Sequence, residues 1–317
     1  MMFDRIKVWE RQIVNGDILI DLLNQLKTGE RTALYLKIDE GPDLTCLTMD
    51  NSMFIDYLNN FCKNNNIDRN KIKIETDNLI QPSCWPNHIT FFNVLPFLHG
   101  QRLNFVPSKM IKKHLGFFVC NSRWPRLLLG SHIYAKHREQ TYLTYHQKHL
   151  VNGIENTLNV KSFLDACPLY LDDASNVVVQ EDGYINWDRA YDLLSFYNHI
   201  FVDMVCETWH EGRTFMPTEK TARSIVSKTP FIIYGPIGYL ENLKKLGFKT
   251  FDTIIDESYD RYEGRERIEK IKIILDSVCN KSFYELTQLY QSVESTLEHN
   301  FNVYLSLNEQ TILKTFI

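Results

Sequence analysis

The sequence lacks a long apolar run. Nowhere in its 317 residues is there a stretch of roughly 18 consecutive apolar residues, the length that a membrane-spanning helix needs. The first residues, MMFDRIKVWERQ, are charged and do not resemble the apolar region of a secretory signal. We therefore expect a chain without a membrane span.

Cysteine motifs are missing as well. The seven cysteines are scattered and odd in number, and no two form a Cys-x-x-Cys pair. This usage indicates a reducing compartment, so we expect a cytoplasmic protein with ordinary buried thiols.

Two stretches contain residue types that bind metals, but neither has a complete ligand set. HQKH (146–149) has no further ligands beside its two histidines, and LYLDDAS (169–175) has no matching nucleotide domain before it. We expect no metal requirement.

Glycine-rich nucleotide motifs are absent too. The chain has 13 glycines, yet it contains neither GxxxxGK[ST] nor GxGxxG after a strand. P-loop and GxGxxG-type dinucleotide sites therefore lack their motif.

The chain also lacks a strong positive charge, since its net charge is -4 and its pI is about 6.2. This net charge argues against a protein whose main function is to bind duplex DNA.

What the sequence does contain is an alternation of strands and helices. ALYLKID (33–39) and IKIETD (72–77) predict strands on either side of a helix at 51–65, whereas three prolines in 81–100 predict irregular structure. The alternation predicts parallel βαβ units in an α/β fold of two Rossmann-like domains facing across a cleft, residues 1–112 and 113–317. In the second domain we expect strands at 116–120, 199–208, 230–235 and 249–255, helices after the first three of these, and a helical tail.

One lysine stands at an unusual place. In TFMPTEKTARSIVSKTPFIIYGP (214–236), Thr218 is placed to cap a helix, so Glu219 and Lys220 fall in its first turn. The positive end of the helix dipole favours anions and repels cations. Lys220 adds little to the stability of this helix, so two interpretations are open here: it binds a phosphate together with the free N–H groups of the first turn, or it lies in solvent while Glu219 satisfies the dipole.

Two blocks of the chain resemble the alpha-1,3-fucosyltransferase family. FVDMVCET followed by TFMPTEKTARSIVSKTPFIIYGP is similar to that family's nucleotide-sugar segment, and GFFVCNSRWPRLLLGSHIY is similar to an earlier block. The blocks stand in the family's order and cover most of residues 113–240, while the first 110 residues match poorly. Thr208 stands where the family has Asn, and Met216-Pro217 replaces an aromatic–Ile/Val pair.

The resemblance implies an inverting, metal-independent glycosyltransferase of the two-domain GT-B type. Its C-terminal domain would hold a nucleotide-diphosphate sugar, GDP- or UDP-linked, and transfer the sugar to a hydroxyl of a glycan or glycolipid precursor. Matched by position, Arg126 and Lys220 would bind the diphosphate and Glu219 the ribose hydroxyls. The other residues that the resemblance assigns to the donor site are Thr218, Glu207 near the sugar, and Asn121 and Ser122 in the turn below it.

Inverting transfer also needs a carboxylate that takes the acceptor proton. Glu75 and Asp77, which leave the predicted strand 72–77, are the first candidates. Asp39 and Glu40, after the strand at 33–39, are the second. These carboxylates would project from the N-terminal domain.

Two other functions remain open at this point. A glycosyltransferase of the same chemistry could act on a hydroxymethylated base in DNA, which would need a basic groove formed by the lysine clusters KNNNIDRNKIK and PSKMIKKH. The chain could also be a non-catalytic module that binds a nucleotide sugar without turnover.

Overall fold

The structure is a computed structural model. It describes residues 4–8, 17–38, 43–49, 52–80, 84–90, 94–146, 154, 157–171 and 191–316. Within this part the chain forms two compact units. Unit 1 comprises residues 1–93, 208–216 and 309–317, and unit 2 comprises 94–207 and 217–308. The predicted domain boundary after residue 112 therefore falls inside unit 2. The segment before it belongs there because the amides of Met110 and Lys112 donate to Asn198 and His199.

Unit 1 is built on a parallel sheet. In the described residues its strands lie in the order β1-β2-β5-β6, and each pairs in parallel with the next. Apolar residues of β2, β5 and helices α2 and α3 form its core, with Phe54 and Leu58 fully buried. The elements are β1 (Asp4–Val8), α2 (Asp17–Thr28), β2 (Leu34–Ile38), β3 (Thr48–Met49), β4 (Ser52–Met53), α3 (Phe54–Asn64), η1 (Arg69–Lys71), β5 (Ile72–Thr76), β6 (His88–Thr90) and α13 (Glu309–Phe316).

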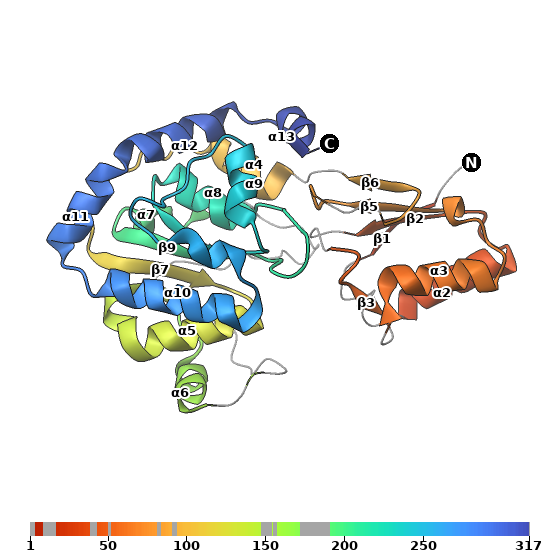
Figure 1. The fold of residues 1–317 in the computed structure, drawn as a ribbon, viewed down its shortest axis with the longest axis horizontal. Coiled ribbons are helices and arrows are strands. Elements are labelled where there is room, and N and C mark those ends of the chain that lie inside the picture. Colours follow the sequence, from red (N-terminus) through yellow and green to blue (C-terminus); the bar gives the residue numbers. More distant parts are fainter. Residues whose placement is uncertain are drawn as a thin grey trace. The chain divides into compact units, whose positions relative to one another are not determined.

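Unit 2 contains a second parallel sheet, with the strand order β10-β9-β7-β8. Helices α5 and α10 pack on one side of it, and α8 and α12 lie on the other (Figure 1). The elements are α4 (Val94–Leu98), η2 (His99–Arg102), β7 (Lys113–Val119), α5 (Trp124–His137), η3 (Arg138–Gln140), β8 (Thr141–Tyr145), α6 (Leu158–Ala166), α7 (Leu194–Tyr197), β9 (Ile200–Cys206), α8 (Glu219–Val226), β10 (Phe231–Tyr234), α9 (Tyr239–Lys245), η5 (Glu257–Arg261), α10 (Gly264–Cys279), α11 (Phe283–Ser292) and α12 (Glu294–Ser306).

Burial explains why the central strands of unit 2 are apolar. Every residue of β9, IFVDMVC, is buried, as are all four residues of β10. Strands of a parallel sheet that is covered on both faces read as continuous apolar runs, which is why the sequence pattern located them. The expected α/β fold with parallel sheets is confirmed.

Two predictions of local structure were wrong. Residues 249–255 form turns, not a strand, because Glu257 accepts hydrogen bonds from the Phe251 amide and the Thr250 hydroxyl and folds the segment back. Residues 81–100 are more regular than expected, since they contain β6 and α4. The proline in α4, Pro96, falls within the first turn of the helix, where a missing N–H costs little.

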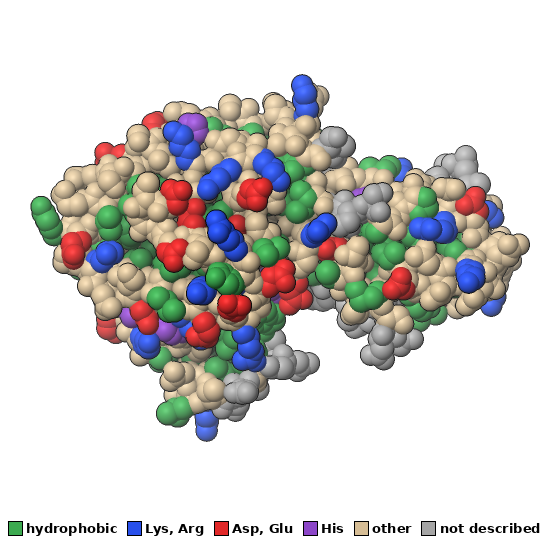
Figure 2. Space-filling view, viewed as in Figure 1, with side chains coloured by type: hydrophobic (Ala, Val, Ile, Leu, Met, Phe, Trp, Pro, Cys, Tyr) green, Lys and Arg blue, Asp and Glu red, His purple; other side chains and the backbone are tan. Residues whose placement is uncertain are grey.

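Among the described residues, no helix combines the length and the apolar character that crossing a membrane requires. On the face drawn in Figure 2, basic and acidic side chains of unit 2 are interspersed, with no large area of one sign.

Candidate functional site

The sheet of unit 2 has a topological switch point between β7 and β9. These strands are neighbours, but the chain continues from β7 to β8 on one side and from β9 to β10 on the other. In open α/β sheets, ligands bind outside the carboxyl ends of the strands at such a point. The turns there carry the predicted donor-site residues of the second domain: Asn121, Ser122 and Arg126 after β7, and Glu207, Thr218, Glu219 and Lys220 after β9.

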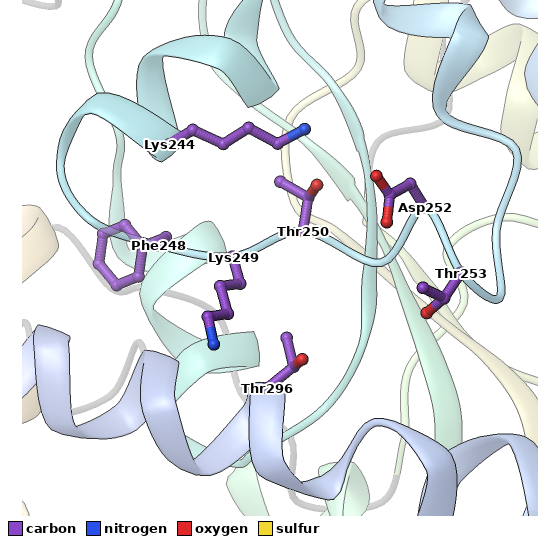
Figure 3. Close-up of a pocket in the computed structure, with 7 residues that line it drawn as sticks. All are labelled: Lys244, Phe248, Lys249, Thr250, Asp252, Thr253 and Thr296. Atoms are coloured by element: carbon purple, nitrogen blue, oxygen red, sulfur yellow. The ribbon is translucent and has the colours of Figure 1, made fainter.

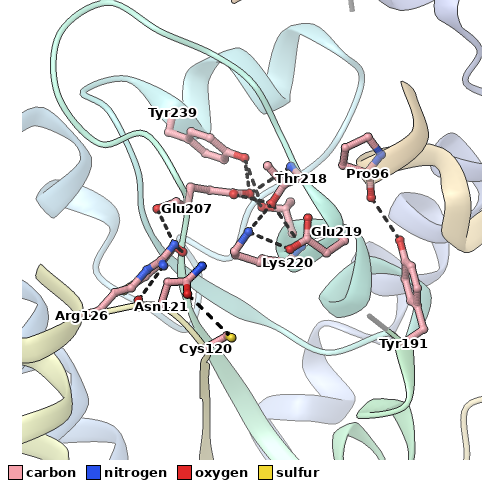
Figure 4. A network of polar contacts seen from close by, with 12 residues as sticks. Pro96, Cys120, Asn121, Arg126, Tyr191, Glu207, Thr218, Glu219, Lys220 and Tyr239 are labelled. Atoms are coloured by element: carbon pink, nitrogen blue, oxygen red, sulfur yellow. Dashed lines mark hydrogen bonds and ion pairs between the residues drawn. The ribbon is translucent and has the colours of Figure 1, made fainter. Parts of the chain in front are cut away.

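Thr218 caps α8 as the sequence predicted. Its Oγ1 accepts a hydrogen bond from the Lys220 amide at 3.3 Å. The Lys220 ammonium folds back over the same turn, donating to Thr218 Oγ1 at 3.2 Å and to Glu219 Oε1 at 2.7 Å (Figure 4). The lysine at the positive end of the helix is therefore neutralised by the carboxylate next to it.

Glu219 is the partner of that lysine. Its side chain is only 11% exposed. Burial works to raise the pKa of this carboxyl, but the nearby Lys220 and Arg223 outweigh it and the pKa is lowered, so the group is ionised. The predicted role as a ribose ligand stays a prediction, and a ligand that takes Lys220 would free Glu219 Oε1.

Glu207 is enclosed within unit 2. It is 2% exposed and accepts four hydrogen bonds. Oε1 receives the Thr218 amide at 3.2 Å, the Thr221 hydroxyl at 2.6 Å and the Tyr239 hydroxyl at 2.9 Å, and Oε2 receives the Thr218 hydroxyl at 2.6 Å. A carboxylate has about four acceptor positions. Glu207 therefore fixes the start of α8 to the end of β9, and its acceptor positions are already in use.

Arg126 joins the two turns. Its guanidinium donates to the backbone carbonyls of Asn121 at 2.9 Å, Cys206 at 3.1 Å and Glu207 at 3.3 Å. The residue is 5% exposed, and burial lowers the pKa of the guanidinium. The rigid fork of an arginine suits such multiple contacts. Arg126 is thus bonded to protein carbonyls and positions both turns, so only its charge and its remaining N–H groups are left for an anion.

Arg126 and Lys220 lie on the same side of the sheet end. Burial raises the pKa of the Cys120 thiol, and both cations oppose that rise. Burial likewise raises the pKa of the Cys206 thiol to about 12, and both cations again oppose that rise. Arg126 and Lys220 therefore bring two positive charges, one from each turn, to the same end of the sheet (Figure 4).

The turn after β7 contributes two smaller groups. Asn121 is exposed and supplies the carbonyl that Arg126 binds. The Ser122 hydroxyl is hydrogen-bonded to the Tyr145 hydroxyl on β8. These contacts order the turn below Lys220.

The candidate bases lie in the other unit. Glu75 is on β5 and its carboxylate is 3.7 Å from the Lys37 ammonium on β2, its partner in the strand register. Asp77 follows β5 and is 2% exposed. Both residues are therefore largely shielded from solvent. Asp39 and Glu40 lie outside the described residues.

The segment between Glu207 and Thr218 belongs largely to unit 1. Asp43 Oδ2 accepts the Arg213 amide at 2.6 Å, and Asn78 accepts the Phe215 amide at 3.0 Å and donates to the Arg213 carbonyl at 2.8 Å. The chain thus leaves unit 2 after β9 and returns to it at Pro217. The sequence alone indicated no partner for this loop.

A shallow pocket of about 300 Å³ lies elsewhere in unit 2 (Figure 3). It is formed by the end of α9, the turns that follow and one residue of α12. None of the predicted site residues lines it. The lining residues are Lys244, Phe248, Lys249, Thr250, Asp252, Thr253 and Thr296.

Sequence reasoning missed a buried acid in β9. Asp203 is 2% exposed and accepts hydrogen bonds from Tyr197 at 2.8 Å and Ser224 at 2.7 Å. The signal was present, because a charged residue inside the apolar run IFVDMVC must have partners. One charged neighbour is Lys109, whose ammonium donates to the Tyr197 carbonyl and to Thr229. Lys109 comes from the lysine cluster that the DNA-binding alternative would need, and these contacts use its ammonium within unit 2.

Comparison of the chain with protein-family models, with curated proteins and with solved structures found no match.

Proposed function

We propose that this protein is a glycosyltransferase that moves a sugar from a nucleotide-diphosphate donor to a hydroxyl acceptor. The observation that carries the proposal is the cationic turn pair at the switch point of unit 2, where Arg126 bonds to the carbonyls of Cys206 and Glu207 and Lys220 stands in the first turn of α8. The residues that supply it are those that resemble the fucosyltransferase donor segment. We propose a GT-B-like arrangement of two domains, in which unit 2 binds the donor.

The diphosphate would bind at the start of α8. A helix N-terminus offers free N–H groups and partial positive charge, and an incoming phosphate would replace the Glu219 carboxylate on the Lys220 ammonium. Each charge-assisted hydrogen bond contributes roughly 1.5–3 kcal/mol. Arg126 would add its charge while it holds the two turns together through their carbonyls.

The proposed reaction is a direct displacement. The acceptor oxygen attacks the anomeric carbon, the bond from that carbon to the diphosphate oxygen breaks, and the acceptor proton passes to a carboxylate. Glu75 or Asp77 is the proposed base. The positive charges at the switch point stabilise the departing diphosphate, where negative charge develops.

The test is a thermal-shift screen of the full chain against UDP-, GDP-, CMP- and dTDP-sugars. The true donor, at ~100 times its dissociation constant, should add about 2.7 kcal/mol of stability. Lys220→Met should lose most of this gain. Lys245→Met is the matched control, because it removes one positive charge from an exposed position on α9.

Two results would contradict the proposal: no shift with any nucleotide sugar, or a shift that Lys220→Met leaves intact. A donor that binds should also be hydrolysed slowly or transferred to added glycans, which chromatography of the released nucleotide would detect. Binding without any turnover would indicate the non-catalytic module instead.

A further inference from the structure

Two histidines and an aspartate converge between α5 and α10 of unit 2. His132 Nε2 and His137 Nε2 each lie 2.6 Å from the same oxygen, Asp276 Oδ1. The two histidine side chains are 11% and 9% exposed, and the aspartate is 32% exposed. The three ligand atoms lie within 4.8 Å of one another. None of these residues belongs to the proposed donor site.

The hydrogen bonds around His137 define which ring nitrogen carries its proton. Gln140 donates its amide N–H to the Cys279 carbonyl at 2.7 Å, and a carbonyl only accepts. The Gln140 Oε1 atom must therefore be the one that faces His137 Nδ1, at 3.2 Å. An amide oxygen only accepts as well, so the Nδ1 atom carries the hydrogen. A neutral His137 then directs the lone pair of Nε2 toward the Asp276 carboxylate.

A lone pair and a carboxylate oxygen 2.6 Å apart need a cation between them. Two cations can meet this need, a proton on His137 Nε2 or a divalent ion that both rings and the carboxylate bind, and the Lys136 ammonium is already 3.0 Å from Asp276 Oδ2. A single divalent ion binds both imidazoles and the carboxylate at one point, whereas a proton bridges only one ring and the acid. Lys136 takes Oδ2 and leaves Oδ1 for the ion.

We propose that His132, His137 and Asp276 bind a divalent transition-metal ion of the zinc type. Imidazole and carboxylate suit such ions, and metal-bound histidines usually donate their other ring N–H to an oxygen, as His137 does to Gln140. Zinc–nitrogen and zinc–oxygen distances are about 2.0–2.2 Å, which places tetrahedral ligand atoms roughly 3.3–3.5 Å apart, so each histidine nitrogen would move about 0.7 Å away from Asp276 Oδ1 to admit the ion.

The position of the site indicates a structural role. His132 and His137 lie in the second half of α5, and Asp276 lies in the last turn of α10, so the negative ends of two helix dipoles favour a cation there. Arg126 is in the first turn of α5, roughly 9–16 Å away along the helix axis at about 1.5 Å per residue. The ion would link α5, the helix that carries Arg126, to α10. It would not contact the donor.

Equilibrium dialysis of the full chain against Zn²⁺, followed by metal analysis, tests the proposal. We expect one zinc ion per chain and a rise of roughly 5 °C or more in the midpoint of thermal unfolding at saturating zinc. His137→Gln and Asp276→Asn should each abolish stoichiometric binding. Gln140→Leu should weaken it roughly 10- to 100-fold, because it removes the acceptor that orients the ring.

His299→Gln is the control, because His299 lies on α12 and its Nε2 is hydrogen-bonded to the Gly247 carbonyl, away from His132, His137 and Asp276 in the sequence. It should bind zinc as the wild-type chain does. A wild-type chain that retains no zinc overturns the proposal, and so does zinc binding that His137→Gln and Asp276→Asn leave unchanged. If a variant fails to fold, long-range ¹⁵N NMR of the wild-type histidines decides, since zinc should shift Nε2 of His132 and His137 and an unchanged spectrum would refute the site.

Discussion

Two hydrogen bonds join Thr218 to the Glu207 carboxylate. The Thr218 amide donates to Glu207 Oε1 at 3.2 Å and its hydroxyl to Oε2 at 2.6 Å, while the same hydroxyl oxygen caps α8. The residue that follows β9 thus determines where the next helix begins. This pairing fixes the place of Lys220, which is the first requirement of the proposed donor site.

Replacing Glu207 should therefore destabilise unit 2. Glu207→Ala leaves the buried hydroxyls of Thr218, Thr221 and Tyr239 without their acceptor, and we expect a loss of about 3–5 kcal/mol. Urea unfolding of the variant measures it. Glu241→Ala, at an exposed position on α9, is the control and should stay within about 0.5 kcal/mol of the wild type.

Arg126→Lys should separate the structural role of this residue from its charge. The lysine keeps the positive charge but lacks the fork that reaches the carbonyls of Asn121, Cys206 and Glu207. We expect a loss of roughly 2–3 kcal/mol without any ligand, measured by urea unfolding. An unchanged stability would mean that these hydrogen bonds do not hold the two turns.

Asp203 should make stability depend on pH. Burial raises the pKa of this carboxyl to about 6 from 3.8, against the opposing effect of Arg223 and hydrogen bonds from Ser224 and Tyr197. The folded protein therefore binds the proton more tightly than the unfolded chain. The contribution to stability is complete below about pH 4 and is lost as pH rises to about 6, by about 3 kcal/mol.

Asp203→Asn removes this titration. Unfolding free energies measured at intervals from pH 4 to 7 should show a shallower fall for the variant than for the wild-type chain. Parallel curves for the two proteins would show that Asp203 does not titrate in this range.

The candidate bases can be distinguished once a donor and an acceptor are known. Replacing the true base, by Glu75→Gln or Asp77→Asn, should lower kcat by roughly 10²- to 10⁴-fold and leave donor binding intact. Glu75→Gln also weakens the ion pair with Lys37, so unfolding measurements must accompany the kinetics. Full activity in both variants would eliminate both residues as the base.

The sequence by itself was sufficient to predict the α/β fold and most strands of unit 2. Continuous apolar runs such as IFVDMVC and FIIY have few alternatives to a covered parallel strand. The cap at Thr218 and the start of α8 were also predicted, because capping depends on neighbouring residues.

Only the tertiary structure decided what the polar residues contact. Glu207 and Arg126 were predicted to lie at the donor site, and the fold gives them protein partners that the sequence did not indicate, among them the Tyr239 hydroxyl and the Cys206 carbonyl. His132, His137 and Asp276 are separated by up to 144 residues, so no local pattern brings them together. Strand and helix patterns are local properties of the chain, whereas hydrogen-bond partners depend on which distant segments the fold makes neighbours.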